Sequence, residues 1–242
     1  MRAVNAITIE EIAKGFKHKK VIQPLNLNIA ERKIFGLLGP SGCGKTTLIK
    51  MIVGMMKPDT GKITVLDCEV PNEALLSEIG YMAQSDALYT ELTGAENLEF
   101  FAKLYRLSKK EQRERIQYAA EIVQLTNDLS IRVAYYSGGM KRRLSLAIAL
   151  IQNPKILILD EPTVGMDPVL KQSIWKELER LKNDEHKTIL ITTHVMDEAE
   201  RCDNLAMLRE GKIIASGTPT ALKTQYGVQT FDEVFLKIVG EL

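Results

Sequence analysis

A glycine-rich loop between a buried strand and a helix constrains this 242-residue chain more than any other feature. The segment 33–38 reads Lys-Ile-Phe-Gly-Leu-Leu, which is apolar on both faces and typical of a central strand. A helix is predicted to begin near Lys45 and to end by Gly54. The loop matches G-x-x-x-x-G-K-[ST] and consists of Gly39, Pro40, Ser41, Gly42, Cys43, Gly44, Lys45 and Thr46, with Thr47 following.

Such a loop binds phosphate through its backbone. Glycines let successive N–H groups point at one anion, and the following helix directs the positive end of its dipole to the same place. Lys45 is expected to reach the β- and γ-phosphates of a nucleotide, and the Thr46 hydroxyl to hold Mg²⁺. An ordinary glycine-rich turn is the alternative, and the strand–loop–helix context favours the nucleotide site. Cys43 is either a small residue that fills the loop or a thiol whose pKa Lys45 lowers.

A second apolar strand ends in two acids. The run 156–159 is Ile-Leu-Ile-Leu, and Asp160 and Glu161 follow it. An acid at the end of a buried parallel strand can bind the water shell of Mg²⁺, a role that suits Asp160. Glu161 can polarise a water for attack on the γ-phosphorus. The alternative is a strand that simply leaves the sheet into a polar turn.

Strands and helices alternate before residue 90 and after Pro154, which predicts an α/β fold with a mainly parallel, three-layer sheet. The first strands, near 6–13 and 21–29, are expected to form an antiparallel portion. We therefore predict one nucleotide-binding domain over 1–242. Its core comprises 1–89 and 154–215, its helical subdomain 90–153, and its C-terminal helical tail 216–242. Capping boxes are predicted at Ser108 and Thr230.

The composition is that of a globular protein, with 45% apolar and 26% charged residues. The net charge of +1 argues against binding nucleic acid through bulk positive charge. No apolar run approaches the ~18 residues that a membrane span needs. No secretory signal is predicted, and the three cysteines form no C-x-x-C pair, which favours a reducing, cytoplasmic setting.

Taken together, the motifs resemble those of the ATP-binding-cassette (ABC) ATPases over nearly the whole chain. The matching residues, in the family's order, are 39–47, Gln84, Tyr136, Ser137, Gly138, Gly139, Met140, 156–161, Asp167 and His194. The resemblance implies a P-loop NTPase fold that binds ATP and Mg²⁺ and hydrolyses ATP.

The resemblance also implies roles for single residues. Ser137, Gly138 and Gly139 would complete the ATP site of an opposing subunit, and Asp167 would cross the same interface. Gln84 would contact Mg²⁺ or the attacking water, and His194 the γ-phosphate. Phe16 would stack on adenine, with core packing as the alternative. Taken singly, Ser137 and Asp167 could be helix caps, and Gln84 and His194 ordinary structural residues.

The sequence departs from the family's Leu-Ser-Gly-Gly-Gln signature at both ends, where Tyr136 and Met140 stand. The residues expected to touch phosphate are retained, so ATP binding is still predicted. Met140 cannot make the contact of an amide side chain. The following run, Lys141, Arg142 and Arg143, is expected to form a solvated helix face, with a phosphate-facing role as the weaker alternative.

Local motifs resemble the drug-exporter branch (ABC-2 type, daunorubicin-resistance-like). With one phosphate loop and one Ser-Gly-Gly, the chain is expected to work as a homodimer or pseudo-symmetric pair. Export would require separate polytopic permease subunits and a place at the cytoplasmic face of the membrane. The alternative is a soluble cassette ATPase that acts on ribosomes or nucleic acid. A DNA-repair ATPase would need a long coiled coil, and a small-molecule kinase would lack Ser-Gly-Gly.

Overall fold

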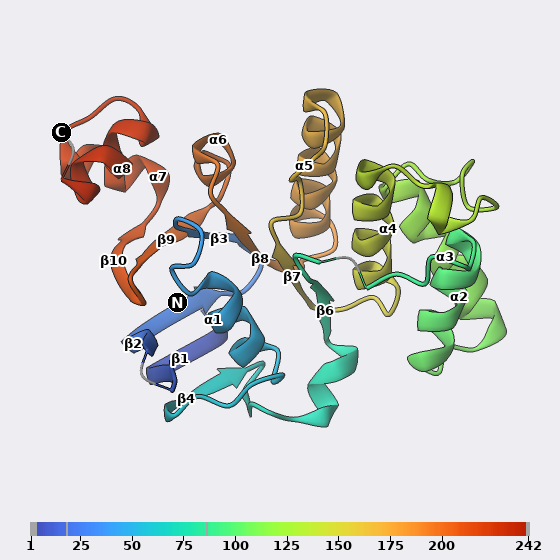
Figure 1. Ribbon diagram of the computed structural model, residues 1–242, viewed down its shortest axis with the longest axis horizontal. Coiled ribbons are helices and arrows are strands. Elements are labelled where there is room, and N and C mark those ends of the chain that lie inside the picture. Colours follow the sequence, from blue (N-terminus) through green and yellow to red (C-terminus); the bar gives the residue numbers. More distant parts are fainter. Residues whose placement is uncertain (1–3, 18, 86, 241–242) are drawn as a thin grey trace. The chain divides into compact units, whose positions relative to one another are not determined.

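The computed structural model describes residues 4–17, 19–85 and 87–240 (Figure 1). The chain divides into two compact units, one formed by residues 1–73 and 188–242 and the other by residues 74–187. Within the described part of the chain, no helix has both the length and the apolar character needed to cross a membrane.

The first unit contains an antiparallel sheet with the strand order β2-β1-β4-β5. Its strands are β1 (Asn5–Phe16), β2 (Lys19–Ala30), β4 (Thr60–Val65) and β5 (Cys68–Glu69). Ile7 pairs with Ile29 and Ile9 pairs with Leu27, so apolar residues on alternate positions share one buried face. The predicted antiparallel portion is confirmed.

Parallel strands in the same unit position the glycine-rich loop. β3 (Ile34–Leu38) is buried at all five residues and pairs in parallel with β8 (Thr188–Thr193) and β9 (Asn204–Arg209). β10 (Lys212–Gly217) runs antiparallel to β9. The helices α1 (Lys45–Ile52) and α6 (Met196–Glu200) follow β3 and β8. The buried strand and the helix predicted around the loop are thus confirmed.

The C-terminal helices are α7 (Pro219–Tyr226) and α8 (Phe231–Val239). Phe231 and Val234 of α8 share a buried cluster with Leu38 of β3 and Met207 of β9. The capping box predicted at Thr230 is present, because its side chain accepts from the N–H of Glu233 and the Glu233 carboxylate accepts in return. The tail is therefore packed onto the parallel strands.

The second unit combines a parallel strand pair with helices. β6 (Ile79–Met82) pairs with β7 (Ile156–Asp160), and α5 (Pro168–Asn183) follows β7. Three helices lie between β6 and β7 in the sequence and pack on one another (Figure 1). They are α2 (Gly94–Leu104), α3 (Lys109–Ile122) and α4 (Gly138–Leu150). Short 3₁₀ helices lie at Glu73–Ser77 and Val133–Tyr135. The predicted helical block and the Ser108 capping box are confirmed.

Candidate nucleotide-binding site

The glycine-rich loop joins β3 to α1 in a conformation that only glycine allows at two positions. Gly44 precedes α1 with a φ of 114°, and a Cβ there would lie 2.6 Å from Cδ1 of Ile22. A Cβ at Gly39 would lie 2.3 Å from the carbonyl oxygen of Leu208. The first N–H groups of α1 are therefore presented at the end of a tightly curled loop, as an anion site requires.

Lys45 lies inside this loop. Its side chain is buried, and Nζ donates to the carbonyl oxygens of Gly39 at 2.7 Å and Pro40 at 3.1 Å. The ammonium group is thus held beside the backbone that would surround a phosphate. Thr46 and Thr47 are half-buried in the first turn of α1.

The register of β3 and β8 brings a second predicted residue to the same edge. Leu38 and Thr193, the last residues of β3 and β8, are paired in the parallel ladder. Gly39 and His194, which follow them directly, therefore both lie at the carboxyl end of these strands. The Thr193 hydroxyl donates to Glu198 at 2.8 Å and accepts from the N–H of Val195 at 3.0 Å. These bonds fix the turn that carries His194, whose side chain is exposed.

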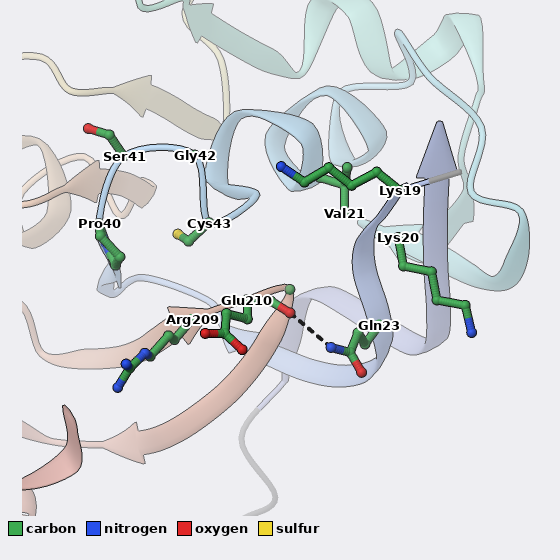
Figure 2. A pocket seen from close by; sticks show the side chains of 11 residues that line it. Lys19, Lys20, Val21, Gln23, Pro40, Ser41, Gly42, Cys43, Arg209 and Glu210 are labelled. Carbon is green, nitrogen blue, oxygen red and sulfur yellow. Dashed lines mark hydrogen bonds between the residues drawn. The ribbon is translucent and has the colours of Figure 1, made fainter. Parts of the chain in front are cut away.

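A cavity of about 430 Å³ adjoins the loop. It is lined by Lys19, Lys20, Val21, Gln23, Pro40, Ser41, Gly42, Cys43, Arg209, Glu210 and Gly211. In Figure 2 the Cys43 side chain extends from the loop toward the Arg209–Glu210 turn, whereas Ser41 points away from it. The Gly211 N–H donates to the Cys43 carbonyl at 3.1 Å and so ties the loop to the 209–211 turn, which Gln23 in turn contacts by donating to the Glu210 carbonyl at 3.0 Å.

Two alternatives for single residues are resolved here. Burial raises the pKa of the Cys43 thiol, and the lowering effect of the Lys45 charge is smaller, so the interpretation as a low-pKa thiol is wrong. Phe16, at the end of β1, is 44% exposed, with Nζ of Lys14 lying 5.7 Å from the ring centroid. The core-packing interpretation of Phe16 is therefore wrong.

The two predicted acids and Gln84 come together in the second unit. Met82 pairs with Leu159, so the residues that follow β6 and β7 lie at one edge. Nε2 of Gln84 donates to Oε2 of Glu161 at 3.5 Å. Asp160 and Glu161 are both buried, and Glu161 has a φ of 53°, in the left-handed region.

The expectation of a solvated face at Lys141, Arg142 and Arg143 is wrong for Arg142, whereas Lys141 and Arg143 are half-buried. Arg142 is only 6% exposed and donates to the carbonyl oxygens of Ala83, Gln84, Asp160 and Glu161. Arg143 donates to the carbonyls of Val123 at 3.3 Å and Gln124 at 2.7 Å. From Met140 onward every residue of the helix is buried or half-buried, so the Arg142 guanidinium finds backbone acceptors in place of water.

The Ser-Gly-Gly segment opens α4. Ser137 is the N-cap, and its Oγ accepts from the N–H of Met140 at 3.2 Å. Ser137 and Gly138 are exposed, and a Cβ at Gly138 would meet nothing within 4 Å. The chain's own packing therefore does not explain a glycine at 138. Asp167 is likewise a cap, because its carboxylate accepts from the N–H of Leu170 at 3.0 Å at the start of α5.

The predicted residues are divided between the two units. Phe16, residues 39–47 and His194 belong to the first, whereas Gln84, Ser137, Asp160, Glu161 and Asp167 belong to the second. Sequence reasoning missed Arg142. The signal that could have indicated it is an arginine directly before the largely apolar run 144–150 of the same helix, most of which is buried.

Comparison with known proteins gives a consistent result. Residues 22–164 match the family described as ABC transporter. The chain is 46% identical, over 220 residues, to Nod factor export ATP-binding protein I of Rhizobium meliloti, covering 90% of this chain and 65% of that protein. The chain thus spans about two thirds of the length of that relative.

Two solved structures resemble this one closely. A structure of the ATP-binding subunit of an ABC transporter superposes with a TM-score of 0.88 at 28% identity, covering 97% of this chain and 99% of that one. A dimeric ATP-binding cassette in a post-hydrolysis state, bound to ADP and Pi, superposes with a TM-score of 0.81 at 26% identity. The match covers 88% of this chain and 98% of that one. The fold is accordingly that of the P-loop NTPases, as predicted.

Proposed function

Because the chain belongs to the ABC transporter family, we propose that it binds and hydrolyses ATP to drive export through separate membrane subunits. The observation that carries the proposal is the curled loop after β3, which holds the Lys45 ammonium against the Gly39 carbonyl at 2.7 Å. Within the chain, we assign 1–89 and 154–215 to the ATP-binding core, 90–153 to a helical subdomain and 216–242 to a C-terminal tail.

ATP binding is assigned to the loop and its surroundings. The N–H groups of residues 39–47 would surround the phosphates, and Lys45 would exchange its carbonyl partners for β- and γ-phosphate oxygens. Phe16, being exposed at the end of β1, is free of the core and suited to stack on adenine.

The residues available for Mg²⁺ fit its preference for oxygen ligands. Thr46 follows the loop lysine, Asp160 ends a buried strand, and Gln84 supplies an amide oxygen at that strand's neighbour. A hard cation bound through one or two protein oxygens and phosphate oxygens needs no larger cage. When bound, it would neutralise charge that develops on the transferred phosphoryl group.

Hydrolysis is assigned to Glu161, Gln84 and His194. Glu161 would accept the proton of the attacking water, since its carboxylate lies within reach of the Gln84 amide, which would orient the same water. His194, on the turn fixed by Thr193, would donate to the γ-phosphate.

A second copy, or a similar partner, would complete each site. Ser137, Gly138 and Gly139 form an exposed helix N-terminus with room beside Gly138, which suits the phosphates of an opposing subunit's nucleotide. Asp167 would cross the same interface. The post-hydrolysis cassette that resembles this chain is dimeric, which supports a two-fold pair.

Export is supported by the similarity to a Nod factor export ATP-binding protein. By the same similarity, separate polytopic permease subunits would carry the cargo, and the chain would lie at the cytoplasmic face of the membrane. Nucleic acid is not an expected partner.

The test is affinity purification of the tagged chain from detergent-solubilised membranes, with Glu161→Gln as the matched control. We expect a polytopic permease in both preparations and magnesium-dependent ATPase activity only with the unaltered chain. Recovery of ribosomes without a membrane protein would overturn export in favour of a soluble cassette ATPase.

A further inference from the structure

We propose that Arg142 is a positioning residue for ATP hydrolysis. It would set Gln84 and Glu161 relative to each other and tie both to the helix that begins at Ser137. This inference rests on the proposed function, because it takes Glu161 as the base that acts on the attacking water.

The contacts of Arg142 carry the inference. Nη1 donates to the carbonyl oxygens of Ala83 at 2.7 Å and Gln84 at 3.0 Å. Nη2 donates to the carbonyl of Glu161 at 2.7 Å and also to that of Asp160. One guanidinium therefore bridges the carboxyl ends of β6 and β7, at the residues that immediately precede or carry the proposed catalytic side chains.

Arginine is suited to this task by its shape. The guanidinium is planar and permanently charged, and it presents its N–H groups in a fixed fork, whereas a lysine ammonium is a single point on a flexible stem. Glu161 has a left-handed backbone, with a φ of 53°, which non-glycine residues adopt rarely. Fixing its carbonyl holds that turn, and with it the direction of the carboxylate that lies 3.5 Å from Gln84.

The position of Arg142 in α4 adds a second consequence. Ser137, the N-cap of this helix, lies just over one turn earlier and is proposed to contact the nucleotide of the opposing subunit. Glu161, by contrast, acts on the nucleotide of its own subunit. Arg142 thus connects a residue of one ATP site to the base of the other, and the two sites of a dimer should influence each other through it.

The test compares Arg142→Lys with Arg143→Lys in the full chain. Both arginines lie on α4 and donate to backbone carbonyls. The carbonyls that accept from Arg143 belong to Val123 and Gln124, which are not among the proposed catalytic residues. Arg142→Lys should lower kcat roughly 10- to 100-fold, with the Kd for ATP nearly unchanged, because misplacement of reacting groups affects the chemical step. The Hill coefficient for ATP should fall toward one. Arg143→Lys should retain both kcat and cooperativity.

Folded protein is counted in every case by the stoichiometry of bound ATP, so that loss of fold is not mistaken for loss of positioning. Amide exchange should accelerate at residues 83–84 and 160–161 in Arg142→Lys and stay unchanged in α2. Turnover per bound ATP equal to that of the unaltered chain would overturn the inference, as would equal losses in both variants. If the unaltered chain itself hydrolyses no ATP, the proposed function fails instead.

Discussion

The hydroxyl of Tyr136 fills the space that a side chain at Gly94 would need, since a Cβ at Gly94 would lie 2.3 Å from its oxygen. The same hydroxyl donates to the carbonyl of Asp128 at 2.8 Å, and the ring is buried. Gly94 is the first residue of α2, and Tyr136 precedes the N-cap of α4. A tyrosine where the family's signature has leucine thus lies against the first residue of α2 while its hydroxyl is bonded to the loop that follows α3.

This contact predicts a non-additive pair of substitutions. Tyr136→Phe should cost about 1 kcal/mol of the free energy of unfolding, because a buried hydrogen bond is lost. Gly94→Ala should cost about 1–3 kcal/mol in the unaltered chain through overpacking, and less beside Tyr136→Phe. Urea unfolding of the four proteins measures the coupling. Strictly additive costs would show that the two residues do not share this space.

The loop lysine should determine affinity for nucleotide. Lys45→Ala removes the ammonium proposed to bind the β- and γ-phosphates, so the Kd for ATP should rise well beyond about tenfold. Calorimetry measures the Kd, and urea unfolding serves as the control for a retained fold. An unchanged Kd would contradict the assignment of Lys45.

Replacing the proposed base should separate binding from chemistry. Glu161→Gln keeps shape and hydrogen-bonding capacity but cannot accept a proton, so hydrolysis should fall about 10²- to 10⁴-fold, or about 3–5 kcal/mol of barrier. ATP affinity should hold or improve, and an ATP-bound dimer should accumulate on size exclusion. Asp160→Asn should differ by weakening magnesium-dependent binding as well. Hydrolysis at the unaltered rate in Glu161→Gln would transfer the role to His194 with Gln84.

The buried thiol predicts a particular pH dependence. Burial raises the pKa of Cys43, so its thiolate fraction at neutral pH is smaller than that of an ordinary thiol, and alkylation should accelerate only at higher pH. Bulky alkylation should then block ATP, and Mg-ATP should protect the thiol. Mass spectrometry at increasing pH follows the reaction, with Cys43→Ala reporting the background from Cys68 and Cys202. Fast modification at neutral pH would contradict the raised pKa.

The proposed dimer contact predicts a defect confined to assembly. Ser137→Arg should leave ATP binding to the isolated subunit nearly intact, because Ser137 is assigned to the opposing nucleotide. The bulky side chain should abolish ATP-driven dimerisation, which light scattering with the Glu161→Gln background would detect. An equal loss of ATP binding by the monomer would place Ser137 in its own site or in folding.

Motifs formed by residues close together in the sequence were sufficient to predict much of the fold. The loop, the apolar strand before Asp160 and the capping boxes at Ser108 and Thr230 each depend on residues a few positions apart. The same holds for the helices of the 90–153 block, because hydrophobic periodicity records which face is buried.

Arg142 and Arg143 show where such reasoning stops. Their charge predicted a solvent-exposed face, but their hydrogen-bond acceptors are backbone carbonyls at 83–84, 160–161 and 123–124. Every residue has a backbone carbonyl, so residue types cannot indicate which carbonyls will accept. The buried Leu144 and Leu146 indicate a helix without a free face, which is the one local hint. The left-handed φ of Glu161 could not be predicted either, because glycine is the usual sequence signal for that conformation and this position holds a glutamate.

Because the space beside Gly138 is open, a substitution there can raise the stability of the isolated chain while lowering its activity. Alanine fits there without a clash and would restrict the unfolded chain, a change that stabilises proteins by roughly 0.4–1 kcal/mol where the backbone is compatible. The added methyl group would, however, occupy the surface proposed for a partner's phosphate. Thermostability screening of the isolated chain would therefore favour a substitution that selection for transport would remove, so an engineer who optimises this protein by melting temperature alone should leave residue 138 untouched.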